Sequence, residues 1–168
     1  SNFTVNVPAV NGNIVTTADT GTITQAMIGS GMFAGYGPAF SAYNSAGQTV
    51  ATNSYTKIVM DTKIFDTGTC YNNTGSTTTL NGLSVPSYSF CPNVAGYYNV
   101  GAFITAYSSP ANVGECIGQI YKNGGAYAIL SDNNSSTWGV GGGSITLYLN
   151  GTGDYVGFYV YLGTSSGG

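Results

Sequence analysis

Residues 115–130 have the sequence ECIGQIYKNGGAYAIL, and this stretch decides the fold class. Two runs with β-branched and aromatic residues, 115–122 and 126–130, flank Asn123-Gly124-Gly125. Asn and Gly tolerate the positive φ angles that the tight turns of β-hairpins require. The stretch therefore predicts two strands joined by a hairpin turn at Asn123 and Gly124.

Runs of the same kind recur along the rest of the chain, separated by clusters of Gly, Asn, Ser and Pro, and almost no segment has helical periodicity. Residues 151–154, GTGD, predict a second hairpin turn of the same kind. Many short strands at even spacing are typical of a sandwich or barrel. The sequence predicts an all-β, two-sheet jelly-roll sandwich, with further strands at residues 39–43, 56–61, 87–91, 97–107, 143–149 and 155–162.

The composition fits one domain of 168 residues and excludes several classes of function. Apolar residues make up 42% of the chain, too many for a disordered protein. Three Lys or Arg against six Asp or Glu cannot form a basic surface for nucleic acid or a polybasic membrane patch. Because the chain has no His, a His-dependent triad or zinc site is excluded. No apolar run reaches the ~18 residues of a membrane helix, so the chain is not expected to insert into a membrane.

Five short motifs point to a family. They are AFSAY at 39–43 with Phe40, KIVMD at 57–61 with Asp61, FDTG at 65–68 with Phe65 and Asp66, AGYY at 95–98 with Gly96, Tyr97 and Tyr98, and IYKNG at 120–124 with Asn123 and Gly124. In order and spacing they resemble the complement-q globular head, a tumour-necrosis-factor-like jelly roll. The resemblance implies a homotrimer whose usual work is binding rather than catalysis, and it implies structural roles for these motif residues.

The N-terminal part of the chain carries a narrower resemblance. Residues 15–29, running into residues 37–40, are similar to tail-associated proteins of tailed bacteriophages that carry this domain. The resemblance implies two parts, an extended assembly or attachment segment at 1–37 and the jelly-roll domain at 38–168. It also implies a location on the surface or tail of a virion.

The chain departs from the family at its C-terminus. The family closes its sheet with a last strand, whereas this chain continues after Leu162 only as GTSSGG. The missing strand would lie between the first strand and the long strand after Gly96, which leaves two strand edges without partners. Phe3, Val5 and Val7 alternate with polar residues, so the segment 3–7 is expected to fill this gap in its own subunit or in a neighbour.

Two aromatic residues are predicted to contact a partner at the surface, Tyr71 and Trp138. Both fall in polar segments without a strand pattern, although Trp138 could also pack beneath its loop. The expected contact loops are residues 71–87, 108–114 and 132–142, because long polar loops tolerate variation. Most other tyrosines alternate along strands and are expected to pack in the core or at an interface.

The carboxylates give little support to catalysis or metal binding. Glu115 and Asp132 are the candidates for a pair of catalytic acids, but no motif supports them, so the chain is not expected to be an enzyme. Asp61 and Asp66 are expected to hold turns or to pair with Lys57 or Lys63. No cofactor is expected, while calcium remains an alternative through Asp132, Asn133 and Asn134, or through Asp154 and Asn150.

Cys70, Cys91 and Cys116 are odd in number, so at least one thiol is free or pairs between chains. A bond between Cys70 and Cys91 and three buried thiols are both compatible with the sequence.

Two functions follow from these sequence features. The first is a non-enzymatic structural and binding protein of a phage virion: a tail fibre, decoration or receptor-binding appendage that contacts itself, other virion proteins and a host-surface glycan or receptor. The second is an extracellular filament or adhesin subunit, polymerised by a donated N-terminal strand. Fold alone does not decide between them.

Overall fold

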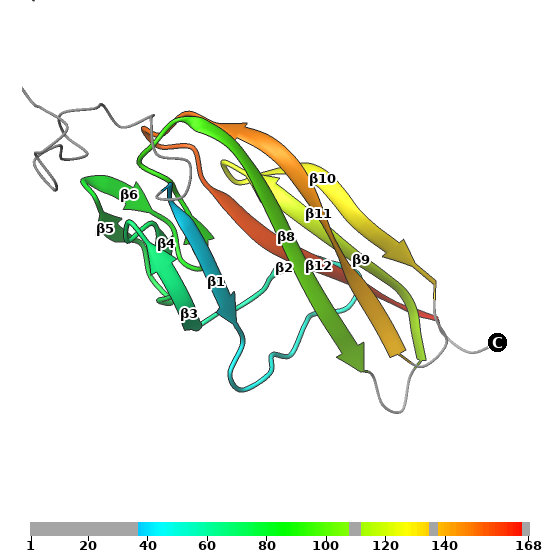
Figure 1. The fold of residues 1–168 in the computed structure, drawn as a ribbon. Coiled ribbons are helices and arrows are strands. Elements are labelled where there is room, and N and C mark those ends of the chain that lie inside the picture. Colours follow the sequence, from blue (N-terminus) through cyan, green and yellow to red (C-terminus); the bar gives the residue numbers. More distant parts are fainter. Residues whose placement is uncertain (1–36, 108–111, 135–137, 166–168) are drawn as a thin grey trace, which may run out of the picture. The chain divides into compact units, whose positions relative to one another are not determined.

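The computed structural model describes residues 37–107, 112–134 and 138–165. The chain divides after Gly35, and every described residue belongs to the unit Tyr36–Gly168. The described residues form strands, turns and bends but no helix, so the predicted all-β class is confirmed (Figure 1). Accordingly, this part of the chain holds no helix that could cross a membrane.

Twelve strands make up the described part of the chain, and Figure 1 labels them. They are β1 (Ala39–Tyr43), β2 (Tyr55–Lys57), β3 (Thr62–Thr67), β4 (Tyr71–Asn72), β5 (Thr78–Leu80), β6 (Leu83–Val85), β7 (Ser89–Phe90), β8 (Gly96–Tyr107), β9 (Asn112–Lys122), β10 (Gly125–Asn133), β11 (Trp138–Leu149) and β12 (Val156–Ser165).

The strands pair in antiparallel sheets. The largest sheet has the order β10-β9-β12-β7-β4, and β2 also pairs with β12. A second sheet pairs β8 with β11 along their whole length, from Gly96 opposite Leu149 to Tyr107 opposite Trp138. Two smaller sheets pair β1 with β3 and β5 with β6. This arrangement is consistent with a β-sandwich.

The hydrophobic core lies between the largest sheet and the β8–β11 sheet. Along β12 every second residue is buried, as period-two alternation requires of a strand with one covered face: Val156, Phe158, Val160 and Leu162. Ile120 on β9 and Leu147 on β11 belong to the same cluster. Each fully buried side chain of this kind contributes about 1.5–3 kcal/mol to stability.

One side of the sandwich is closed by contacts between β10 and β11. The Ser131 hydroxyl oxygen accepts a hydrogen bond of 2.6 Å from the Gly142 amide, and the Asn133 side chain donates to the Val140 carbonyl. A Cβ atom on Gly143 would lie 2.8 Å from the Leu130 carbonyl oxygen, so glycine allows the close approach here. Side chains therefore join the two sheets along this side.

The two predicted hairpin turns have different outcomes. Asn123 and Gly124 have φ angles of 53° and 81° and connect the paired strands β9 and β10, as predicted. The turn at residues 151–154 connects β11 and β12, which do not pair, because β11 pairs with β8 and β12 with β9. The prediction of a second hairpin is therefore wrong, and this turn crosses from one sheet to the other.

The region before β8 also differs from the prediction. Residues 56–61 do not form one strand: β2 ends at Lys57, and β3 begins at Thr62. A further hairpin, β5–β6, lies within the predicted contact loop 71–87. Asn81 and Gly82 form its turn with φ angles of 50° and 77°, the same signal as at Asn123 and Gly124.

Candidate functional site

Two strand edges face each other without a partner. In the part of the chain that the structure describes, β1 pairs only with β3, and β8 pairs only with β11. Figure 1 shows β1 and β8 running in the same direction, with β12 behind the space between them. The backbone groups of β1 and β8 that face this space have no ladder partner among the described residues.

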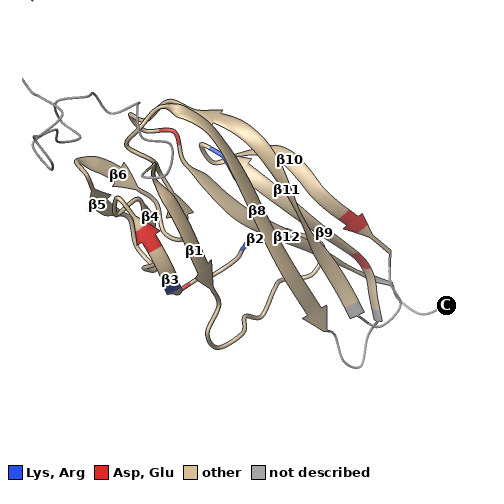
Figure 2. Ribbon diagram, in the orientation of Figure 1, with Lys and Arg blue, Asp and Glu red and all other residues tan. Residues whose placement is uncertain are grey.

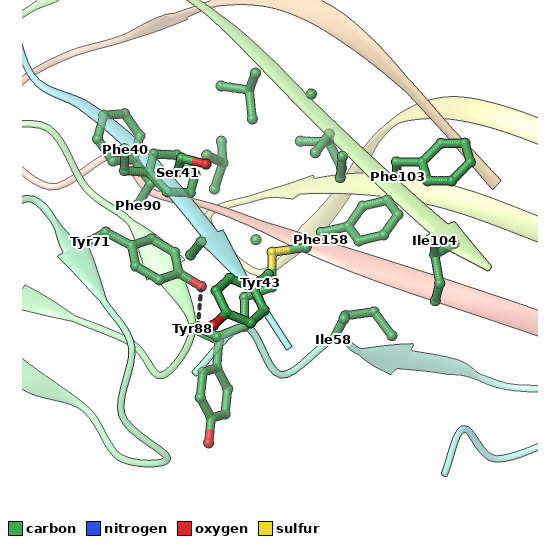
Figure 3. Close-up of a pocket in the computed structure, with 18 of the residues that line it drawn as sticks. Phe40, Ser41, Tyr43, Ile58, Tyr71, Tyr88, Phe90, Phe103, Ile104 and Phe158 are labelled. Carbon is green, nitrogen blue, oxygen red and sulfur yellow. Dashed lines mark hydrogen bonds between the residues drawn. The ribbon is translucent and has the colours of Figure 1, made fainter. Parts of the chain in front are cut away.

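The opening is an apolar groove of about 850 Å³, which we call the β1–β8 groove. Phe40 and Ala42 of β1 lie along one wall, and Val100, Ala102 and Ile104 of β8 lie along the other. Buried core residues, Ile120 among them, form the floor. Figure 3 labels further floor residues: Ile58, Phe90 and Phe158. The groove therefore reaches down to the core of the sandwich.

Stacked aromatic rings form one end of the groove (Figure 3). The Phe40 ring lies 4.5 Å from the Tyr71 ring and 4.7 Å from the Phe90 ring, and Tyr98 meets Phe90 edge-on at 5.6 Å. The Tyr71 hydroxyl donates to the Met60 carbonyl, and the Tyr98 hydroxyl donates to the Val94 carbonyl. Burial raises the pKa of both tyrosines, so this end stays uncharged at neutral pH.

The chemistry of the groove suits recognition rather than catalysis. None of the described residues that line it is Asp, Glu, Lys, Arg or Cys. β8 and β11 contain no charged residue, and Figure 2 shows the charged residues on other parts of the fold. What the groove offers is an apolar floor between two rows of backbone N–H and C=O groups. An extended peptide matches both features, because its backbone pairs with the two rows of backbone groups and its alternate side chains contact the apolar floor.

The structure bears on one of the two predicted surface contacts, Tyr71 and Trp138. Tyr71 is only 3% exposed, so the prediction that it is a surface contact is corrected. It is buried because its ring packs on Phe40 and its hydroxyl has a backbone acceptor. Trp138 opens strand β11 opposite Tyr107 rather than lying within a loop, and its side chain is outside the described residues.

Phe3, Val5 and Val7, predicted to fill the gap, also lie outside the described residues. The groove walls contributed by Ala42, Ala102 and Ile104 were not singled out from the sequence. The alternation along residues 97–107 was the signal that could have found the β8 wall.

The predicted roles of two aspartates are confirmed. Both Asp61 oxygens accept hydrogen bonds from Ser45, which hold a turn, and the bond from the Ser45 amide is the main reason that the Asp61 pKa is lowered. Asp66 pairs with Lys63 at 3.0 Å and accepts hydrogen bonds from the amides of Cys70 and Tyr71. These carboxylates are structural.

The other motif residues lie at separate places in the fold. Gly96 begins β8, and Tyr97 is 79% exposed beside it. Phe65 is 48% exposed on β3. The Asn123 amide group donates to Asp154, and its oxygen accepts from the Tyr155 amide, which holds the β9–β10 turn against the start of β12.

Two of the residues considered for calcium, Asp154 and Asn150, are engaged in the turn before β12. Asp132 and Asn133 lie on β10. Asp154 accepts hydrogen bonds from the Asn123 side chain and the Asn150 amide and pairs with Lys122 at 3.0 Å. These interactions, with the Asn123 bond first, lower the pKa of Asp154. Within the described ranges, no cluster of three or more His, Cys, Asp or Glu side chains could hold a metal ion.

All three cysteines are free and buried, so Cys70 and Cys91 are not bonded to each other. Burial raises the pKa of each thiol, which keeps it protonated and unreactive at neutral pH.

Comparison with known proteins adds no assignment. The sequence matches no protein-family model, and no curated protein matches it.

Proposed function

We propose that this chain is a non-enzymatic structural protein that assembles with copies of itself, and that a strand from another copy fills the β1–β8 groove. The supporting observation is the groove itself. It opens to the core between two strand edges that have no partner in the described ranges, and its described lining carries no charged side chain. A buried strand edge is costly, and an exposed one invites pairing with another chain. A strand between β1 and β8 would complete a jelly-roll sheet in the order β1, added strand, β8, β11.

The chain carries a segment suited to this position. In residues 3–7, FTVNV, three apolar side chains alternate with two polar ones. As a strand, the segment would direct Phe3, Val5 and Val7 to the groove floor and the polar residues to solvent. Burying each apolar side chain is worth about 1.5–3 kcal/mol. Pro8 follows at the point where the strand leaves the sheet, where a missing N–H is tolerated.

The connection is long enough for donation to a neighbour. Residues 8–38 lie between the segment and β1, and an extended chain of that length reaches on the order of 100 Å. Strand donation from one copy to the next is a heterologous contact, which generates a ring or a filament. The proposed setting is therefore an extracellular filament or adhesin.

An uncharged sheet face supports the second candidate, a homotrimeric appendage of a phage virion. Neither β8 nor β11 contains a charged residue, and their solvent-facing side carries exposed apolar side chains, among them Tyr97, Phe103, Val140 and Tyr148. Large apolar side chains exposed on one sheet face favour an interaction site. In this candidate, the face would pack around a threefold axis, as the resemblance to the complement-q head implies.

Light scattering on three purified proteins tests the proposal: the wild type, Val5→Asp and Thr4→Asp. We expect the wild type to form a broad, very large species and Val5→Asp to abolish it, because a carboxylate would enter the apolar floor. Thr4→Asp is the matched control, since its added charge would point to solvent and leave the large species intact.

Two results would overturn strand donation between copies. A discrete mass near three chains that Val5→Asp leaves unchanged would favour the virion appendage. A wild-type monomer that Val5→Asp destabilises would mean that the segment fills the groove of its own subunit.

A further inference from the structure

Four tyrosines form a cluster on the outer face of the largest sheet, away from the groove. They are Tyr55 on β2, Tyr121 on β9, and Tyr159 and Tyr161 on β12. Tyr121 and Tyr159 stack with ring centroids 3.9 Å apart, and Tyr55 lies 6.0 Å from Tyr121 and 5.4 Å from Tyr161. We call these four residues the tyrosine cluster.

The strand register explains why the rings share one face. Phe158, Val160 and Leu162 of β12 point into the core, so Tyr159 and Tyr161 point to the other side. Ile120 of β9 is buried in the same core, which places Tyr121 on the outer face. The core does not need these rings, and all four keep part of their surface open to solvent.

Hydrogen-bond acceptors without donors surround the rings. Gln119 lies opposite Tyr159 in the sheet and is 8% exposed, and its amide oxygen is buried with no partner among the described residues. Glu115 and Asp132 lie on the same face, opposite Gly163 and Ile117. Neither carboxylate forms a hydrogen bond or an ion pair in the described part of the chain.

The two carboxylates are close enough to act on the rings electrostatically. Burial is the main cause of the raised pKa of Tyr55, and the negative charges of Glu115 and Asp132 contribute to it. The cation beside the cluster is already engaged: the Lys57 ammonium donates to the Ser89 hydroxyl at 2.8 Å and lies 5.8 Å from the centre of the Tyr159 ring.

This combination defines the chemistry of a ligand. Aromatic rings bind flat apolar surfaces. Acceptors without donors favour a ligand that carries hydrogen-bond donors, such as hydroxyl groups. The carboxylates disfavour an anionic ligand, because like charges repel. A neutral sugar has apolar C–H faces and a rim of hydroxyl donors, and so meets all three conditions.

We propose that the tyrosine cluster binds a neutral polysaccharide, whose sugar rings stack on the tyrosines while their hydroxyls donate to Glu115 and Asp132. This site is independent of the β1–β8 groove and of how the chain assembles.

Affinity electrophoresis in native gels tests the proposal. The gels contain dissolved dextran, mixed-linkage β-glucan or galactomannan as neutral probes, and polygalacturonate as the anionic probe. We expect at least one neutral polysaccharide to retard the wild type and polygalacturonate to leave it unretarded. Tyr121→Ala and Tyr159→Ala should each weaken the retarding interaction by about tenfold, which corresponds to the loss of about 1.4 kcal/mol. Glu115→Gln should weaken it less.

Two further variants separate binding from folding. Tyr121→Phe keeps the ring and should keep most of the retardation. Tyr148→Ala removes an exposed ring from the other sheet, where it meets Tyr97 edge-on at 5.5 Å, and should have no effect.

The proposal is overturned if none of the three neutral polysaccharides retards the wild type, or if Tyr148→Ala weakens retardation as much as Tyr121→Ala. It is also overturned if Tyr121→Ala changes the native mass instead of the retardation, because the cluster would then be a contact between copies.

Discussion

The rings of Phe40 and Tyr71 lie parallel, with 4.5 Å between their centroids and 5° between their planes. Phe40 belongs to β1, which forms one wall of the groove and pairs only with β3 among the described strands. Tyr71 is held in place by the hydrogen bond from its hydroxyl to the Met60 carbonyl. The stack therefore fixes the position of one groove wall relative to the core.

Phe40→Ala should lower the free energy of unfolding by about 2 kcal/mol, less than the 3–5 kcal/mol typical of a fully buried Phe because Phe40 is half-buried. Urea denaturation at pH 7 measures the change. Phe65→Ala is the matched control on the neighbouring strand. Because the Phe65 ring is exposed, its removal should lower the free energy of unfolding by well under half as much as Phe40→Ala. Equal losses in the two variants would contradict the anchoring role of the stack.

Gly142→Ala should destabilise the protein by about 1–3 kcal/mol, because a Cβ atom there would lie 2.6 Å from the Ala102 carbonyl oxygen and 2.8 Å from the Phe103 Cα. Both are backbone atoms that cannot move without shifting β8. Thermal unfolding checks this prediction. Gly37→Ala is the control, since nothing lies within 4 Å of its added atom and the thermal midpoint should not change.

Stability should fall as the pH rises above about 9. Burial raises the folded-state pKa of several neutral acids, so the unfolded chain loses these protons first. Their stabilisation is complete below the unfolded-state values, about 8.5 for Cys and 10 for Tyr, and is lost as the pH rises toward the folded-state values. The groups are Tyr55, Tyr71, Tyr98, Tyr159, Cys70, Cys91 and Cys116.

Lys57 opposes this trend, because burial lowers its pKa and stability therefore rises with pH up to the unfolded-state value. One lysine does not outweigh seven acids. The urea midpoint of the wild type should decline from pH 7.5 through pH 9 to pH 10.5. The midpoint of Tyr71→Phe should decline less steeply. The free energy of unfolding of this variant at pH 7.5 should be about 1 kcal/mol lower, since it lacks the hydrogen bond to Met60. A flat wild-type profile would contradict the prediction.

Stability should also fall in acid, for a different reason. Hydrogen bonds and the Lys122 ion pair lower the folded-state pKa of Asp154. Its contribution is complete above the unfolded-state value of about 3.9 and is lost as the pH falls through the folded-state value. Asp154→Asn should therefore lower the urea midpoint at pH 7 and make the loss between pH 5 and pH 2.5 smaller. A variant as acid-sensitive as the wild type would show that other carboxylates dominate.

The strand positions could be predicted because they depend on local patterns. Phe158, Val160 and Leu162 alternate with Tyr159 and Tyr161, and this alternation predicts β12 directly. Asn123 and Gly124 specify the β9–β10 turn because both tolerate a positive φ angle. The same reasoning applied to Asn81-Gly82 would have found the β5–β6 hairpin.

Features that depend on distant partners could not be predicted in this way. Gly151 and Gly153 have positive φ angles like a hairpin turn, but the pairing of β11 with β8 makes their turn a crossover. Tyr71 sits in a polar stretch, and its burial depends on Phe40, far away in the sequence. The tyrosine cluster likewise requires the register of β2 on β12, which no local pattern specifies.

The common direction of β1 and β8 has a consequence for growth. A strand that is antiparallel to one of them is antiparallel to both, so each copy would receive its neighbour's segment in the same sense. A polymer built this way is polar: one terminus presents a vacant groove and the other an unused segment. A free peptide of residues 3–7 would occupy the vacant groove at one terminus and the vacant grooves of incoming copies, and would therefore slow elongation at both termini.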